Sequence, residues 1–186
     1  SQTEFIALTA MIMATTAFSI DAMLPALPEI AAELTPDMPN RAQLMITSFV
    51  FGMGVGTFFT GPLSDAIGRR KVIIGGVAIY IAAVIAAYFA QSLEVMLAAR
   101  VVMGLGAAGP RVGAIAMTRD LYAGRDMARI MSFIMVVFSL VPAMAPTIGH
   151  YIIEGFGWRG IFAAFAVFAT LMMAWLWLRQ PETLSS

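Results

Sequence analysis

Hydrophobic residues make up 60% of this 186-residue chain, whereas charged residues contribute 12% and cysteine is absent. This composition excludes an ordinary soluble domain, and a formal net charge of zero argues against nucleic acid as a partner. With one histidine, no cysteine and no phosphate-binding loop, the chain offers no cluster of metal ligands and no site for ATP hydrolysis. We therefore expect no metal, no cofactor and no enzyme activity.

Six apolar stretches follow one another, each long enough to cross a hydrocarbon core of about 30 Å. We predict helices at residues 5–34, 42–62, 72–90, 95–118, 130–154 and 160–178. The first stretch is too long and too polar for a cleaved signal peptide, so we interpret it as a spanning helix. The sequence thus predicts an all-α, polytopic membrane protein in which residues 1–186 form one six-helix bundle.

The charges between the stretches predict how the bundle is oriented. One side of the membrane would hold seven basic residues, and the other only Arg41 and Arg159. The seven are Arg69, Arg70, Lys71, Arg119, Arg125, Arg129 and Arg179. Because Lys and Arg accumulate in cytoplasmic loops, we expect both termini to be cytoplasmic.

Short connections and many glycines predict close helix packing. Small residues let helix backbones approach each other in a membrane, and we assign that role to Gly52, Gly54, Gly56, Gly75, Gly76, Gly104, Gly106 and Gly109. The chain also divides into two sets of three helices, residues 5–90 and 95–178. The first helix of each set carries a charge and a proline, as in transporters built from inverted repeats.

Asp21 lies inside the first stretch, where an ionised carboxylate needs a partner. Pro25 lacks the amide that would bond the carbonyl of residue 21, and Pro28 repeats the disruption. Two interpretations stay open. Asp21 is either a structural residue at a helix kink or a protonatable acid that couples transport to protons or binds substrate.

Arg100 is the natural partner for Asp21. Asp21 precedes Glu29 by about 12 Å of helix rise, and Glu94 precedes Arg100 by about 9 Å, so the two charges lie at similar depth. A pair would lower the cost of burying each charge, and a proton or a substrate would compete with it.

Arg111 follows eleven residues after Arg100 and returns to nearly the same helix face, about 16 Å away. Either it lines a water-accessible cavity, because lipid-facing arginines are costly, or it bonds backbone carbonyls freed at Gly109 and Pro110.

Three segments resemble the major facilitator superfamily. Residues 61–71, GPLSDAIGRRK, resemble its loop signature between helices two and three, and residues 97–108 resemble the fourth-helix signature of proton-coupled members. Residues 21–28, DAMLPALP, are similar to the first helix of the twelve-helix drug:proton antiporters, nearest the bicyclomycin-resistance type. The resemblance spans all six helices.

This resemblance implies roles for particular residues. Asp65 would form a cytoplasmic latch by facing a helix N-terminus of another six-helix half, which the helix dipole favours. The other latch residues would be Gly61, Gly68, Arg69, Arg70 and Arg119. Asp21 and Arg100 would be the proton-coupling and substrate-proximal pair.

The chain also departs from the family pattern. Ala66 replaces a basic residue that is common in the loop signature. The fifth helix contains an antiporter-like motif that includes Pro142. Pro146 and Gly149 match the antiporter signature, but the leading and final glycines of that signature are missing. Arg111 lies outside the general pattern and would favour an anionic substrate.

Family members have about twelve helices in two halves with the substrate between them, and this chain supplies one half. We expect either the N-terminal half of a longer protein or a homodimer. The implied function is proton-coupled export of small lipophilic or amphipathic compounds by alternating access, in the bacterial inner membrane. The alternative is a non-transporting membrane module with the same fold, such as a solute sensor or an assembly subunit.

Overall fold

The computed structural model describes residues 2–34, 37 and 43–179, and all of their regular secondary structure is helical. The side chains of Gln2, Thr3, Thr15, Thr16, Asp21, Val137, Pro142 and Arg179 lie outside the description. The helices are α1 (Gln2–Asp21), the short 3-10 helix η1 (Leu24–Ala26), α2 (Leu27–Leu34), α3 (Leu44–Ile67), α4 (Arg69–Tyr88), α5 (Leu93–Leu121), α6 (Gly124–Phe156) and α7 (Trp158–Arg179). With α1, η1 and α2 as one span, the described residues form six spans long and apolar enough to cross a membrane. This confirms the predicted all-α, six-span class.

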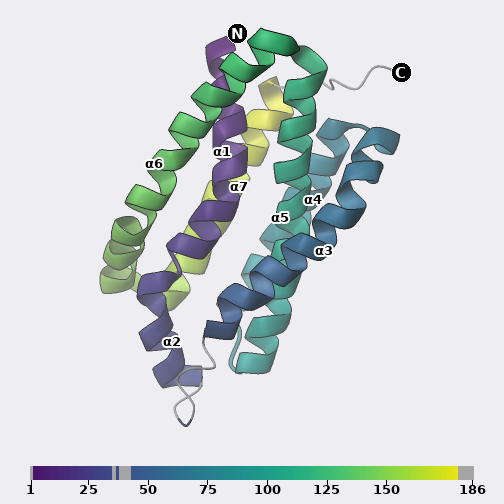
Figure 1. Cartoon of the computed structure of the whole chain (residues 1–186). Coiled ribbons are helices and arrows are strands. Elements are labelled where there is room, and N and C mark those ends of the chain that lie inside the picture. Colours follow the sequence, from purple (N-terminus) through teal and green to yellow (C-terminus); the bar gives the residue numbers. More distant parts are fainter. Residues whose placement is uncertain (1, 35–36, 38–42, 180–186) are drawn as a thin grey trace.

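The helices pack in two groups of three spans (Figure 1). One group consists of α3, α4 and α5, and the other of α1 with α6 and α7. Contacts of α4 with α7 and of α1 with α5 join the groups. Each group therefore takes two spans from one predicted repeat and one span from the other.

The first span is interrupted instead of continuous over 5–34. α1 ends at Asp21, and Pro25 lies within η1, at the start of a 3-10 turn. Pro28 is the second residue of α2, where a missing amide costs little. The two prolines thus separate a long helix from a short one directly after Asp21.

The segment 61–71 is almost entirely helical, which differs from the predicted loop. α3 continues past Pro62 to Ile67, α4 begins at Arg69, and only Gly68 lies between them. Gly68 has φ 106° and ψ 155°, and its amide bonds the carbonyl of Ser64 at 3.1 Å. Charges do not end a helix, whereas a positive φ does, so the turn is confined to the residue without a Cβ.

The helix α6 begins at Gly124, six residues before the predicted start at 130. Gly124 has φ 59°, and Asp126 lies in the first turn, where a negative charge interacts favourably with the helix dipole and stabilises the helix. The charged segment that the sequence assigns to a loop therefore belongs to the helix.

Glycines bring α5 close to both of its neighbours. A Cβ on Gly104 would overlap the carbonyl oxygen of Phe49 in α3, and one on Gly76 in α4 would lie 2.5 Å from the carbonyl oxygen of Gly106. A Cβ on Gly52, Gly56, Gly106 or Gly109 would also lie less than 3.0 Å from an atom of the neighbouring helix. Gly54 and Gly75 have open space around them, so the packing role predicted for these two is wrong.

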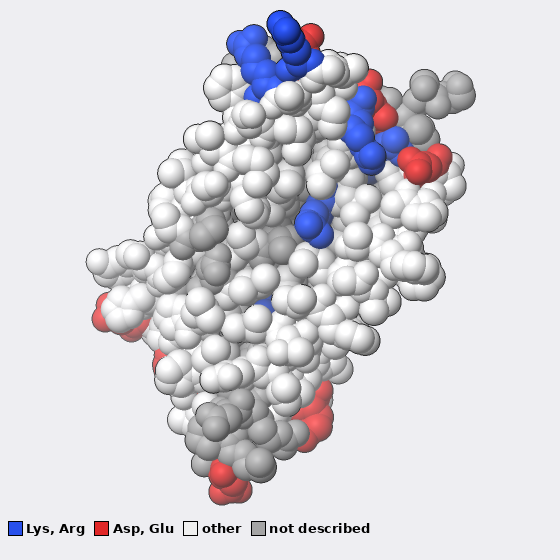
Figure 2. Space-filling view, in the orientation of Figure 1, with Lys and Arg blue, Asp and Glu red and all other residues white. Residues whose placement is uncertain are grey.

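The two ends of the bundle differ in charge (Figure 2). Blue basic atoms gather at the top, where α3 meets α4 and α5 meets α6, with some red acidic atoms beside them, while the charged atoms visible at the bottom are acidic. We call the top the basic end; it carries Arg69, Arg70, Lys71, Arg119, Arg125 and Arg129. We call the bottom the acidic end; it carries Glu29, Glu33, Glu94 and Glu154. The helix α1 begins and α7 ends at the basic end.

Candidate functional site

Arg100 in α5 is the most deeply buried charged side chain among the described residues. It has no exposed surface. Its Nε donates to the carbonyl of Met45 in α3 at 3.1 Å, and its Nη2 donates to the carbonyl of Ser19 in α1 at 3.3 Å. Its guanidinium also lies 4.7 Å from the ring centre of Phe49. Carbonyl dipoles and a ring face thus stabilise a cation away from water.

Tyr80 extends this arrangement to a fourth helix. Its hydroxyl forms a hydrogen bond with the hydroxyl of Ser19, and its side chain is buried in α4. We call Arg100, Ser19, Tyr80 and Met45 the central polar node. The sequence analysis missed Ser19, Tyr80 and Met45, because a hydroxyl or a carbonyl inside an apolar stretch carries no signal of its partner.

The predicted partner Asp21 lies two residues after Ser19, at the end of α1. Arg100 therefore contacts the backbone of the same helical turn. None of the ion pairs between described side chains includes Arg100. The Asp21 side chain lies outside the described part of the structure, so its pairing with Arg100 stays a prediction.

Arg111 lies on the same side of α5, nearer the basic end, and its side chain is exposed. Within the described residues it forms no hydrogen bond or ion pair, including with the carbonyls near Gly109 and Pro110. The described contacts therefore do not support the backbone-bonding alternative, and the water-accessible position stays a prediction.

At the basic end, Arg69 joins α3, α4 and α5. Its Nε and Nη2 donate to both carboxylate oxygens of Asp120 at 2.9 and 3.1 Å, and its Nη1 donates to Asp65 at 2.7 Å. The side chain of Asp120 is 16% exposed and that of Asp65 is 72% exposed, so the bond to Asp120 is the better protected. We call Arg69, Asp120 and Asp65 the basic-end cluster.

The latch prediction named Arg119, yet Asp120 beside it makes the contact with Arg69. Arg119 itself is exposed. The sequence did offer a signal for this contact: Asp120 is the acidic residue at the end of α5, and a carboxylate is the strongest hydrogen-bond partner for a guanidinium such as that of Arg69. Gly68 lets α4 begin directly beside the cluster, whereas Gly61 has open space around it.

Arg70 contacts a different group of helices. Its Nη2 donates to the carbonyl of Trp177 in α7 at 3.0 Å, and its guanidinium lies 4.8 Å from the Trp177 ring centre. The two consecutive arginines Arg69 and Arg70 therefore tie the start of α4 to α5 and to α7.

The antiporter-like motif in α6 does not break the helix. α6 runs without interruption from Gly124 to Phe156, through both Pro142 and Pro146. Gly149 has a clear packing role, because a Cβ there would lie 2.5 Å from the carbonyl oxygen of Ala22. The motif thus brings α6 against the residue that follows Asp21.

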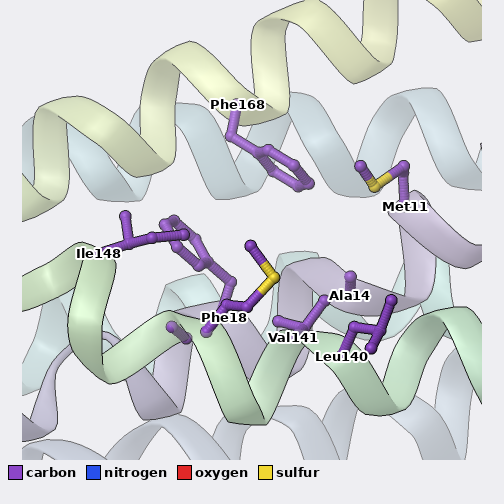
Figure 3. A pocket seen from close by; sticks show the side chains of 9 residues that line it. Met11, Ala14, Phe18, Leu140, Val141, Ile148 and Phe168 are labelled. Carbon is purple, nitrogen blue, oxygen red and sulfur yellow. The ribbon is translucent and has the colours of Figure 1, made fainter.

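An apolar pocket of about 340 Å³ lies between α1, α6 and α7 (Figure 3). Met11, Ala14 and Phe18 line it from α1, Leu140, Val141, Met144, Ala145 and Ile148 from α6, and Phe168 from α7. Phe18 packs against the rings of Phe165 and Phe168, with centroids 5.2 and 5.7 Å away. Methionines and aromatic rings suit apolar ligands of varied shape, and Phe18 directly precedes Ser19 of the central polar node.

Comparison with known proteins identifies the family. A family model described as the Major Facilitator Superfamily matches residues 7–186. The chain belongs to the major facilitator superfamily. This confirms the resemblance drawn from residues 21–28, 61–71 and 97–108.

Within the superfamily, relatives with resistance names are similar to the chain. A bicyclomycin resistance protein homolog of Haemophilus influenzae is 36% identical over 166 residues, covering 89% of this chain and 42% of the relative. A chloramphenicol resistance protein of Pseudomonas aeruginosa is 34% identical over an alignment that covers 88% of this chain and 39% of the relative. The multidrug resistance protein MdtL of Escherichia coli O9:H4 (strain HS) is 35% identical over an alignment that covers 89% of this chain and 43% of the relative. The chain thus spans less than half the length of these relatives.

The superfamily fold is also evident in a solved structure. The proton:xylose symporter XylE superimposes with a TM-score of 0.85 over 98% of this chain and 45% of the symporter, at 13% identity. At that identity the match shows the fold alone.

Proposed function

We propose that this chain is one six-helix half of a proton-coupled exporter of small lipophilic or amphipathic compounds. Three of its relatives are named as bicyclomycin, chloramphenicol and multidrug resistance proteins. The observation that carries the proposal is the buried Arg100, held by backbone carbonyls next to the helix interruption at Asp21.

The central polar node explains how a proton would be coupled to substrate. Arg100 is a fixed positive charge near the end of α1, and it stabilises an ionised acid at Asp21. Protonation of Asp21 removes that attraction, and a substrate that enters the cavity competes for the same place. Binding of one species therefore weakens binding of the other, as exchange transport requires.

The ends of the bundle support alternating access. At the basic end, the basic-end cluster fixes α3, α4 and α5 to one another. At the acidic end, Glu33 of α2 accepts hydrogen bonds from Trp158 and Arg159 of α7 at 2.9 and 3.4 Å. Both contacts let the six helices rock as one unit against a second half.

The basic end supports the proposed orientation, because the positive-inside rule puts it in the cytoplasm. Both termini would then be cytoplasmic, in the inner membrane of a bacterium. The relatives' greater length supports a second six-helix half as partner. It belongs either to the same polypeptide or to a second copy, and the native mass in nanodiscs separates these two arrangements.

The decisive experiment replaces Asp21 by Asn in the full-length protein, reconstituted in liposomes with an imposed pH gradient. We expect Asp21→Asn to abolish proton-driven flux while leaving the folded yield unchanged, because Asn cannot take up a proton. Asp37→Asn, at an exposed position between α2 and α3, is the matched control and should retain flux. Undiminished proton-driven flux in Asp21→Asn would remove Asp21 from the mechanism. Substrate binding without any flux in the unaltered protein would instead favour a solute sensor.

A further inference from the structure

Arg111 lies at a membrane depth where a charged side chain is costly and usually has a functional role. The helix α5 has 29 residues, about 43 Å at 1.5 Å per residue. Arg111 comes about 27 Å after its first residue and about 15 Å before its last. Since the hydrocarbon core is about 30 Å thick, Arg111 lies inside it, on the side of the basic end.

The face of α5 that carries Arg111 meets the boundary between α1 and α3. Arg100, on the same face, bonds carbonyls of both helices. Nearer the basic end, α1 and α3 diverge with α5 between them (Figure 1). Figure 2 shows basic atoms between the two ends of the molecule, over α5, on a surface that is mostly uncharged there. This side of the molecule therefore presents a cation inside the membrane thickness.

The neighbours of Arg111 on its helix face are small and buried. Ala107, Ala108, Ala114 and Thr118 are each at most 1% exposed, whereas Arg111 is exposed. The floor around Arg111 is thus closed by packing, and only the long side chain reaches solvent. A lipid-facing arginine would be costly at this depth, which favours a water-filled cavity in front of it.

Arg111 has no compensating charge within the described residues. It makes no ion pair there, unlike Arg69 at the end of the same bundle. The described acidic side chains lie towards the ends of the helices. A guanidinium beside apolar surface attracts oxyanions and can bind them with two parallel N–H donors.

We propose that Arg111 is an anion-binding subsite, which takes the carboxylate or another oxyanion of an amphipathic small molecule inside the transport cavity. This subsite rests on the proposed function, and it specifies one class of transported compound as anionic. Arg100 bonds backbone carbonyls of α1 and α3, whereas Arg111 binds the anionic group of the substrate.

The test measures equilibrium binding to the full-length protein in nanodiscs, at one pH and without a gradient. The probes are dansylglycine, which carries a carboxylate, and its neutral analogue dansylamide. We expect Arg111→Gln to weaken dansylglycine binding at least about tenfold and dansylamide binding less than about twofold. Arg111→Lys should keep a preference for dansylglycine over dansylamide, because it keeps the charge, but at lower affinity than Arg, because it lacks the two parallel donors. Arg125→Gln, at an exposed position of the basic end in α6, should change neither affinity by more than about twofold.

Other results overturn the proposal. Equal weakening of both probes by Arg111→Gln, or no saturable dansylglycine binding by the unaltered protein, excludes an anion subsite. Lower thermal stability of Arg111→Gln without any preference between probes would assign Arg111 to an ion pair with another part of the protein. If Arg111→Gln does not fold, a dansylglycine affinity of Arg111→Lys no higher than its dansylamide affinity excludes the subsite as well. Because no gradient is used, absence of proton-driven flux leaves this result readable.

Discussion

Gly104 is the position where one added methyl group should disturb the bundle most directly. A Cβ there would overlap the carbonyl oxygen of Phe49 and lie 2.6 Å from the amide nitrogen of Met53. The second distance is about 0.8 Å shorter than the 3.4 Å at which ordinary contact begins. Both obstacles are backbone atoms, so α3 must move away from α5 as a whole.

The expected cost of Gly104→Ala follows from this displacement. Overpacking of an interior costs about 1–3 kcal/mol, and the ring of Phe49 over Arg100 would shift as well. The better helix propensity of Ala returns up to about 1 kcal/mol. Because both obstacles are backbone atoms, we take the upper end of the overpacking cost, and the net loss of about 2 kcal/mol corresponds to a fall of about 4–8 °C in the thermal midpoint of a unit this size. Thermal unfolding of the purified protein in one detergent measures it.

Gly54→Ala is the matched control, since Gly54 lies in α3 with no atom within 4 Å of the added Cβ. It should leave the midpoint unchanged or raise it, because only the gain in helix propensity remains. Equal losses for Gly54→Ala and Gly104→Ala would refute the close approach of α3 and α5.

Three further substitutions test the contacts at the basic end and in the central polar node, and a fourth tests the turn at Gly68. Asp120→Ala should lower stability by about 2–3 kcal/mol, because it leaves a nearly buried Arg69 without its two-bond partner. Asp65→Ala should cost less than about 1 kcal/mol, since its carboxylate is exposed; thermal midpoints in the opposite order would contradict this. Tyr80→Phe should cost about 1 kcal/mol by removing the buried hydrogen bond between its hydroxyl and that of Ser19, and an unchanged midpoint would argue against that bond. Gly68→Ala should cost about 1–3 kcal/mol, because φ 106° and ψ 155° are essentially restricted to glycine, and unimpaired folded yield and stability would contradict the strain.

The number of spans and the family could be predicted from sequence, because length, hydropathy and the signature at residues 61–71 do not depend on which helix faces which. The interruption after Asp21 could also be predicted, since Pro25 and Pro28 remove backbone amides wherever they lie. Such local rules locate the candidate site on the chain without placing it in space.

The partners of the site residues could not be predicted, for a physical reason. In a soluble helix, apolar residues mark the buried face, but lipid is as apolar as a protein core, so the contrast disappears. Phe49 is fully buried and Phe58 is 77% exposed in the same helix, although both are phenylalanine. Tyr80 likewise gives no sign that it bonds a serine 61 residues away.

The division of the bundle into two interleaved groups also affects how the protein is made. As the ribosome delivers the chain, α3, α4 and α5 emerge in succession and can associate at once. The helix α1 emerges before them, but it packs chiefly against α6 and α7, which follow α5 in the chain. The membrane must therefore hold an interrupted helix that ends in an acid while three further spans are inserted, before α6 and α7 can cover it.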